Sequence, residues 1–414
     1  MNTLGIQEHK PISKKERIFE LDIIRGFALI GVLLVNMFAF NTTFFNETFA
    51  TTILKNPLMA NGTLNKAIAI AVQLFAEGKF YTIFSCLFAL GFYIFMDRAE
   101  KKDLSSKKLF LRRTLFLYIF GLVHYTLVWW GDILHVYGLI GFLLIFFKNC
   151  QLKTIKRWII GLLMVSTLLT VGFTLLGEMA PLAMEAEAME AQGHYFNSMV
   201  EESITLHQNG ALLETIQYRL TRETGYRVMG LIVQIPKILG MFLIGLYIGK
   251  KKIFNDLERH RGFIRRTWKI TGFLGALTTF MSTMMLFSLL PIAPIFSSSV
   301  TMFFRETGTI CLSLFYMTSI VRLMKSAVFA KVLMPLRYVG QMALTNYLTQ
   351  CILGSLIFYG HGLGLVQKVG PVTCVLLTVV IFGLQIPFSK YWLGKNQYGP
   401  CEWGWRRLTY GKAV

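Results

Sequence analysis

Ten apolar stretches separated by short polar segments dominate the pattern of this sequence. In residue numbers they cover 23–40, 80–96, 109–128, 132–147, 157–176, 228–249, 264–290, 297–321, 338–358 and 370–393. A helix needs about 20 apolar residues to cross the hydrocarbon core of a bilayer, and most of the stretches reach that length. The stretches 80–96 and 132–147 are shorter, so we expect them to be tilted or to continue into their polar flanks. Residues 64–76 are too few to span, and we expect a helix along the membrane surface.

The lysine and arginine residues alternate between successive connections. If the N-terminus is cytoplasmic, the inner segments contain 32 of the 42 Lys and Arg residues, and the outer segments contain six. Cytoplasmic loops of membrane proteins carry such an excess. The sequence therefore predicts an all-α, polytopic membrane helical bundle of about ten transmembrane helices, with both termini cytoplasmic. We expect it to be a multi-pass protein of the bacterial cytoplasmic membrane.

The composition agrees with this topology. A net charge of +20 beside 54% hydrophobic residues is explained by the inner loops, so the expected partner is a lipid bilayer and not nucleic acid. A homodimer is left open. All six cysteines lie in apolar stretches or inner segments, which indicates neither a disulfide framework nor a metal site.

The chain divides into five parts on this basis: 1–22, a cytoplasmic N-terminal segment; 23–176, a first half of about five helices; 177–227, an acidic outer segment; 228–393, a second half; and 394–414, a cytoplasmic tail. The run PLAMEAEAMEAQ within the outer segment reads as a helix. This segment is either a solvated connection or a lid over an outer cavity, and we favour the connection.

Ionisable residues inside apolar stretches are costly in hydrocarbon and are candidates for function. Asp22 and Arg25 are three residues apart and share one helical face. They form either an intrahelical ion pair or a site where Arg25 binds an anionic ligand entering from the cytoplasm. Glu402 and Arg406, in the tail GPCEWGWRRL, are candidates to join them.

A second set lies deeper in the membrane and comprises Asn36, Arg305, Glu306 and Asn346. Adjacent residues do not face each other on a helix, so Arg305 and Glu306 need separate partners. Asn346 is more simply read as an interhelical hydrogen-bonding residue than as a ligand-binding one.

A third set lies toward the outer side. Glu77 and Lys79 begin one apolar stretch, and the motif GLVHYTLVWWGDILH brings His124, Trp129 and Asp132 close together. A histidine oriented by a carboxylate suits general-base catalysis or proton relay. A lone histidine on an apolar face is more often a satisfied core residue, but the acid eight positions away favours a functional pair of His124 and Asp132.

The motifs LDIIRGFALIGVLLVN, EGKFYTIFSCLFALGF, GLVHYTLVWWGDIL, LTNYLTQ and GPCEWGWRRLTYG together resemble the YeiB-like family of bacterial membrane proteins, also called domain of unknown function 418. The resemblance covers residues 17–411. More distantly, the opening helix is similar to the transmembrane acyltransferase superfamily, whose members move acyl groups from a cytoplasmic acyl-CoA to an acceptor across the membrane.

The second resemblance implies that Asp22 and Arg25 correspond to the acid and arginine of the superfamily's first helix. Acyltransferase family 3 has a histidine eleven positions after its basic residue, whereas this chain has Asn36 there. An amide cannot act as a base, so we assign that role to His124 on chemical grounds.

We therefore expect an acyltransferase without a tightly bound cofactor, using acyl-CoA as co-substrate and a small-molecule or cell-envelope hydroxyl or amine as acceptor. Lys79 or Arg305 would stabilise the oxyanion. The alternatives are a proton-coupled transporter or lipid head-group flippase, or a non-catalytic membrane scaffold. In a transporter the same charged residues would form a polar path.

Overall fold

The computed structural model describes residues 17–45, 61–101 and 105–411, and expectations for 1–16, 46–60, 102–104 and 412–414 lie outside these residues. Every described regular element is helical. The first half contains α1 (Phe19–Phe40), α3 (Thr63–Phe75), α4 (Lys79–Glu100), α5 (Ser106–Leu127), α6 (Leu134–Gly141), α7 (Leu144–Phe147) and α8 (Leu152–Met179). The outer segment forms η2 (Ala180–Ala183), α9 (Ala186–Asn209), α10 (Leu212–Tyr218) and the π-helical η3 (Arg219–Glu223).

The second half contains α11 (Thr224–Lys250), η4 (Ile253–Asn255), α12 (Arg261–Leu286), α13 (Pro294–Leu323), α14 (Ala327–Leu333), α15 (Leu336–Gln341), α16 (Ala343–Phe358), α17 (Pro371–Lys395) and α18 (Pro400–Tyr410). Each of the ten apolar stretches is helical. The short stretch 80–96 continues into polar flanks, as expected, because α4 has 22 residues. The stretch 132–147 is instead broken into α6 and α7.

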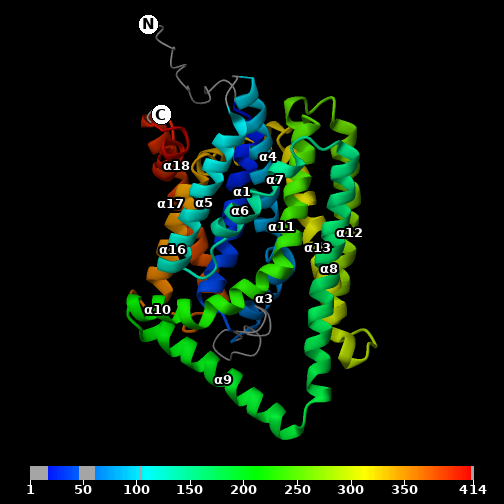
Figure 1. Cartoon of the computed structure of the whole chain (residues 1–414), viewed down its shortest axis with the longest axis vertical. Helices are drawn as coiled ribbons and strands as arrows, with labels where there is room; N and C mark the ends of the chain where they lie inside the picture. Colours follow the sequence, from blue (N-terminus) through cyan, green and yellow to red (C-terminus); the bar gives the residue numbers. More distant parts are fainter. Residues whose placement is uncertain (1–16, 46–60, 102–104, 412–414) are drawn as a thin grey trace.

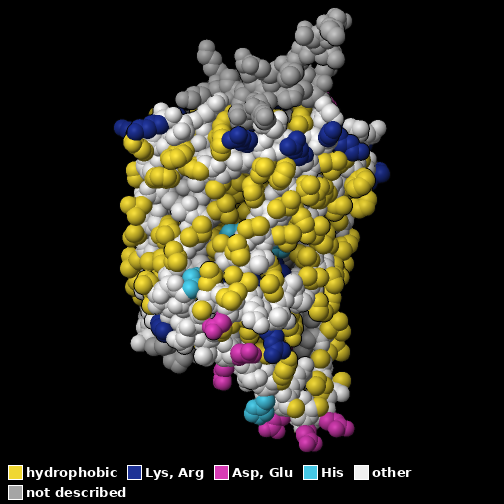
Figure 2. Space-filling view, turned by 60° about the vertical axis from the view of Figure 1, so that its left-hand side comes forward, with side chains coloured by type: hydrophobic (Ala, Val, Ile, Leu, Met, Phe, Trp, Pro, Cys, Tyr) yellow, Lys and Arg dark blue, Asp and Glu magenta, His cyan; other side chains and the backbone are white. Residues whose placement is uncertain are grey.

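Five described segments are long and apolar enough to cross a membrane, and six if α13 and α14, bent by 117°, form one broken span. The protein is therefore a helical membrane bundle, while the count of ten spans stays a prediction. The start of α1 and the C-terminal helix α18 lie at the same end of the bundle (Figure 1). We call this the inner end and the opposite one the outer end. On the face in Figure 2, Lys and Arg gather near the inner end and Asp and Glu near the outer end, with a wide apolar band between them.

The helix α1 lies in the centre of the bundle. It packs against α4, α15, α16 and α17, while α11 packs between α4 and α8. The α1–α15 contact is backbone to backbone, because a Cβ at Gly340 would overlap the carbonyl oxygen of Asp22. By contrast, only 6% of the apolar window of α8 is buried, so α8 presents most of its surface to the surroundings.

The outer segment does contain the helix expected from its sequence. In Figure 1, α9 runs obliquely across the outer end from α8 toward α10. Only Met199, Ser203 and His207 of α9 are buried, so its first half is solvated. Its last turn contacts the α16–α17 connection, where Gly360 N donates to His207 O at 2.7 Å. The segment combines a solvated connection with a docked end.

Candidate functional site

A cavity of about 1040 Å³ lies between α1, α4, α5, α11, α16 and α18. Small-molecule sites commonly have volumes of roughly 300–1,000 Å³, so this cavity suits a large ligand. Two acids line it, Asp22 and Glu402. Eight cationic residues line it, namely Arg17, Arg25, Arg98, Lys101, Arg113, Arg227, Lys237 and Arg406. Such a wall favours an anionic ligand.

Most of these cations lie at the inner end, where both acids are already engaged. Asp22 pairs with Arg25 at 2.8 Å. The Glu402 carboxylate accepts from the backbone N–H groups of Leu344 (2.7 Å) and Thr345 (3.1 Å) and so caps the start of α16. The expected ion pair of the first helix is thus confirmed, and it also lines the cavity. Little negative charge remains to neutralise the other arginines.

Arg113 is held without a carboxylate partner among the described residues. Its guanidinium lies 3.7 Å from the centre of the Trp405 ring and 5.4 Å from that of Phe95. Trp405 Nε1 also donates to Arg113 O at 2.9 Å, which docks α18 on α5. Arg406, one residue further along, stacks on Tyr398 at 4.3 Å. The aromatic rings orient both guanidinium groups at the cavity and leave their hydrogen-bonding edges for a ligand.

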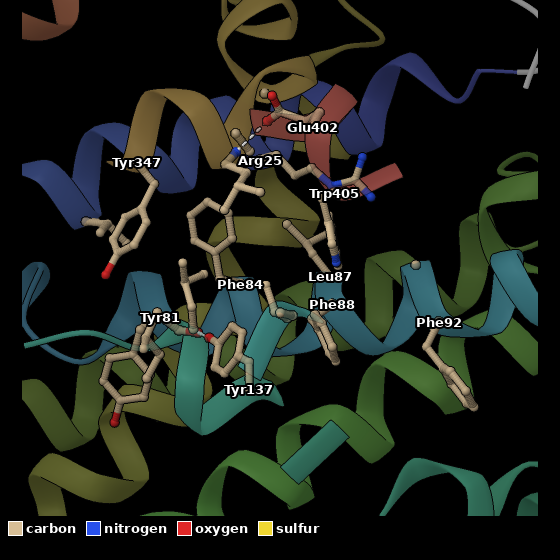
Figure 3. A pocket seen from close by; sticks show the side chains of 18 of the residues that line it. Arg25, Tyr81, Phe84, Leu87, Phe88, Phe92, Tyr137, Tyr347, Glu402 and Trp405 are labelled. Atoms are coloured by element: carbon tan, nitrogen blue, oxygen red, sulfur yellow. Dashed lines mark hydrogen bonds between the residues drawn. The ribbon is translucent and has the colours of Figure 1, made fainter. Parts of the chain in front are cut away.

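The middle of the cavity is apolar. Phe84, Leu87, Phe88 and Phe92 of α4 line the cavity, and Figure 3 shows them across the cavity from Arg25 and Glu402. Residues at spacings of three and four share one helical face, which explains why one helix supplies this wall. A wall of this kind suits a flexible apolar chain.

Beyond the apolar wall, the outer part of the cavity is polar again. It is lined by Asn36, Trp129, Trp130, Arg227 and Lys237, among others. Trp129 stacks on Phe40 of α1 with a ring separation of 4.2 Å. This stacking fixes the α5–α6 turn against α1.

The histidine–carboxylate pair expected from the sequence is present. His124 Nδ1 lies 2.8 Å from Asp132 Oδ1, and Asp132 is fully buried. A second imidazole, that of His135, contacts Asp132 Oδ2 at 2.7 Å, and the backbone N–H of His135 donates to the same oxygen at 2.8 Å. Gly121 permits this arrangement, because a Cβ there would overlap the backbone nitrogen of His135. The carboxylate orients two imidazoles, of which sequence reasoning paired only one with it.

This group lies behind the cavity wall and does not line it. The ring of Tyr347, which does line the cavity, is 5.5 Å from that of His124. His124 Nε2 has no hydrogen-bond partner among the described residues. An oriented imidazole with a free ring nitrogen has the chemistry of a general base. The residues described contain no cluster of three metal-ligating side chains.

The charged residues of the middle set form two ion pairs. Arg305 contacts Glu77 at 2.7 Å, and Glu306 contacts Lys237 at 2.8 Å. The expectation that Arg305 and Glu306 have separate partners is confirmed. Lys79 is buried and donates to the backbone oxygen of Gln73 at 3.2 Å. Neither Lys79, Glu77 nor Arg305 lines the cavity, whereas Lys237 does.

Asn346 is buried and bonds within the protein. Its side-chain nitrogen donates to Val339 O at 3.1 Å and to Ser389 Oγ at 3.0 Å. It does not line the cavity, so the interhelical reading describes its contacts. Asn36 does line the cavity, and its Nδ2 has no partner among the described residues.

The residues that line the cavity but were not proposed from the sequence include Lys237, Arg227 and Tyr347. Lys237 lies inside an apolar stretch, so the cost of a buried charge could have identified it. Arg227 lies at the end of the polar segment and looks like a loop cation. Tyr347 gives no sequence signal, because a tyrosine in an apolar helix is common.

Comparison with known proteins agrees with the resemblance. Residues 248–412 match the family described as "Protein of unknown function (DUF418)". The chain is 30% identical to the "Uncharacterized protein YxaH" of Bacillus subtilis (strain 168), over 97% of this chain and 96% of that protein. It is 26% identical to the "Uncharacterized protein YeiB" of Escherichia coli (strain K12), over 95% and 96%.

A 39.9 kDa protein of Bacillus acidopullulyticus is 29% identical over 97% of this chain and 96% of its own length. No solved structure matches. The names of these relatives describe no activity, so the resemblance to acyltransferases stays a prediction. The match to YxaH extends over almost the whole of both chains, and the chain therefore belongs to the YeiB-like DUF418 family of membrane proteins.

Proposed function

We propose that this protein is an acyltransferase of the bacterial cytoplasmic membrane, which moves an acyl group from cytoplasmic acyl-CoA to a hydroxyl or amine at the outer side. The observation that supports this proposal is the continuity of the cavity. It connects an arginine-rich inner end, an apolar middle and a polar outer end. These three regions match the phosphates, the flexible arm and the reacting end of a thioester donor.

The donor's phosphates would bind at the inner end. Arg113 and Arg406 offer guanidinium edges that no described carboxylate occupies, and Arg25 contributes beside Asp22. Guanidinium groups form bidentate hydrogen bonds with phosphate. The pantetheine arm would extend along Phe84, Leu87, Phe88 and Phe92, which are the residues of the apolar wall.

The reaction would take place in the outer half. His124 Nε2 removes the proton of the acceptor's O–H or N–H group, the acceptor atom attacks the thioester carbonyl carbon, and the C–S bond breaks. The proton then passes from the imidazole to the leaving thiolate. Tyr347 has to move aside or relay the proton, because it separates His124 from the cavity.

Lys237 is better placed than Lys79 or Arg305 to stabilise the oxyanion. Lys237 lines the cavity, whereas Lys79 and Arg305 do not, and its ammonium group is held by Glu306 at 2.8 Å. One well-aimed donor to an oxyanion contributes about 3 kcal/mol of transition-state stabilisation. Arg305 would instead join α13 to the α3–α4 turn through its pair with Glu77, and Lys79 would bond to the backbone oxygen of Gln73.

The test compares two neighbouring arginines in the purified protein. Labelled acetyl-CoA should bind and be hydrolysed or transferred. Arg113→Met should weaken binding by about 10–150-fold, since a hydrogen bond to a charged group contributes about 1.5–3 kcal/mol. Arg112→Met removes the same charge from an exposed position outside the cavity and should leave binding unchanged.

A second candidate is a proton-coupled transporter or flippase, which the same observation also suits, because the cavity extends toward both ends of the bundle. The two ion pairs that join α13 to the α3–α4 turn and to α11 would then carry protons. If a panel of acyl-CoAs neither binds nor turns over, while vesicles containing the protein show proton-dependent uptake, the acyltransferase proposal is wrong and transport replaces it.

A further inference from the structure

The outer part of the cavity is rich in hydrogen-bond donors and cations. Arg227, Gln234 and Lys237 of α11 all line it. Their spacings of seven and three residues place them on one face of the helix. Both acids that line the cavity, Asp22 and Glu402, belong to its inner end, so no described carboxylate lines the outer part.

Several side-chain N–H groups of residues that line the outer part of the cavity have no acceptor among the described residues. Asn36 Nδ2, Trp129 Nε1 and Arg227 Nε are buried without a hydrogen-bond partner among the described residues. They come from three separate elements, α1, the α5–α6 turn and α11. Buried donors normally have acceptors, and a cluster of unpaired donors on a cavity wall calls for a ligand rich in acceptor atoms.

Arg227 connects this cluster to the candidate base. Its Nη2 donates to the backbone oxygen of Asp132 at 3.0 Å, so its guanidinium lies beside the residues that orient His124. A group bound to Arg227 would therefore be held close to the reacting atoms. Lys237 lies ten residues further along α11, about 15 Å deeper at 1.5 Å per residue, and marks the other limit of this region.

We propose that the outer part of the cavity binds an anionic acceptor: a polyol that carries a phosphate or carboxylate near the hydroxyl that receives the acyl group. Arg227 and the unpaired donors of Asn36 and Trp129 bind the anionic group. This inference rests on the proposed function and specifies its acceptor. The acceptor is either a lipid head group or a soluble polyol phosphate, since both present the same chemistry.

Binding without acyl-CoA tests the proposal independently of turnover. Labelled sn-glycerol 3-phosphate is equilibrated with the full-length protein in phosphatidylcholine nanodiscs, with labelled glycerol as the uncharged comparison. Glycerol 3-phosphate should bind at least about tenfold more tightly than glycerol, a difference of about 1.4 kcal/mol. Arg227→Gln should remove this difference. Arg222→Gln, an equal charge change at an exposed residue outside the cavity, should retain it.

A second arm identifies the lipid source. The melting temperature is compared between phosphatidylglycerol and phosphatidylcholine nanodiscs. If it is higher in phosphatidylglycerol, and Arg227→Gln removes this difference, the anionic site is confirmed with a lipid ligand. If Arg227→Gln does not fold, the comparison of glycerol 3-phosphate with glycerol on the wild-type protein still decides. Equal binding of the two, with no effect of phosphatidylglycerol, overturns the inference. Anion binding without any acyl-CoA turnover would instead contradict the acyltransferase proposal alone.

Discussion

Replacing Asp132 by asparagine tests the candidate base most directly. Three hydrogen bonds converge on this buried carboxylate: Oδ1 contacts His124 Nδ1 at 2.8 Å, while Oδ2 contacts His135 Nδ1 at 2.7 Å and its backbone N–H at 2.8 Å. An asparagine amide has one acceptor oxygen and one donor nitrogen. Its oxygen should take the Oδ2 position, where two donors of His135 meet it, so that the NH₂ group faces His124.

His124 must then reverse its tautomer, because two N–H groups would otherwise point at each other. Nδ1 becomes the acceptor and Nε2 carries the proton, so Nε2 no longer acts as a base. A positioned general base contributes about 10²–10⁴-fold to rate, and kcat for acyl transfer should fall by that factor. The hydrogen bond lost to the carboxylate is worth about 1.5–3 kcal/mol of stability. Native proteins are stable by about 5–15 kcal/mol, so the variant should remain folded.

The assay measures acyl transfer in proteoliposomes together with thermal unfolding of the same preparations. Asp97→Asn is the control, because Asp97 forms a more exposed pair with Lys101 at 2.7 Å, and such pairs contribute about 0–1 kcal/mol. If Asp132→Asn keeps more than half of the wild-type kcat, the catalytic reading of His124 is refuted. A loss of rate accounted for by a matching loss of folded protein refutes it equally.

Three further predictions concern the bundle. Gly340→Ala should destabilise the protein by about 1–3 kcal/mol or more, because the new Cβ overlaps α1. Gly383→Ala should be tolerated, because a Cβ at this position meets no atom. Thermal unfolding in detergent distinguishes the two variants. Burial raises the pKa of the Glu402 carboxyl group, so the stability that its protonated form contributes is present below pH 4.5 and is lost as pH rises through the raised pKa. Glu402→Gln should therefore reduce the change of melting temperature with pH between pH 4.5 and 7. An unchanged slope of melting temperature against pH contradicts this prediction. In a double-mutant cycle, Glu77→Gln and Arg305→Met should each lower the free energy of unfolding. The double variant should lose less than the sum of the two single losses, because the 2.7 Å ion pair can be lost only once. Additive losses would show that the two residues do not couple.

Much of the architecture could be predicted from local pattern. Apolar length and alternating basic segments indicated the helices, and α1, α8 and α17 lie close to the stretches that predicted them. The breaks at α6–α7 and α15–α16 were not predicted, because a change of backbone direction within an apolar run leaves no change in hydropathy. Pairs of residues near each other in sequence were also accessible, as Asp22 with Arg25 and His124 with Asp132 illustrate.

The partners of Arg305 and Glu306 required the tertiary structure. The sequence showed that each needs a partner, but Glu77 and Lys237 lie 228 and 69 positions away, and only helix packing brings them into contact. For the same reason, the charges in the sequence did not show which cationic residues line the cavity. Lys79 and Lys237 are both buried cations in apolar surroundings, yet only Lys237 lines the cavity.

By itself, the sequence determined that this is a helical membrane protein and which side chains would be costly to bury, because hydropathy, charge and helical spacing act over a few residues. The tertiary structure alone decided that one cavity connects the inner arginines with the outer donors, that His124 lies one ring behind its wall, and that His135 shares the same carboxylate. These features depend on rotation and close approach of whole helices, through contacts such as Gly121 against His135. Packing sets such contacts across long separations in sequence, so no local pattern encodes them.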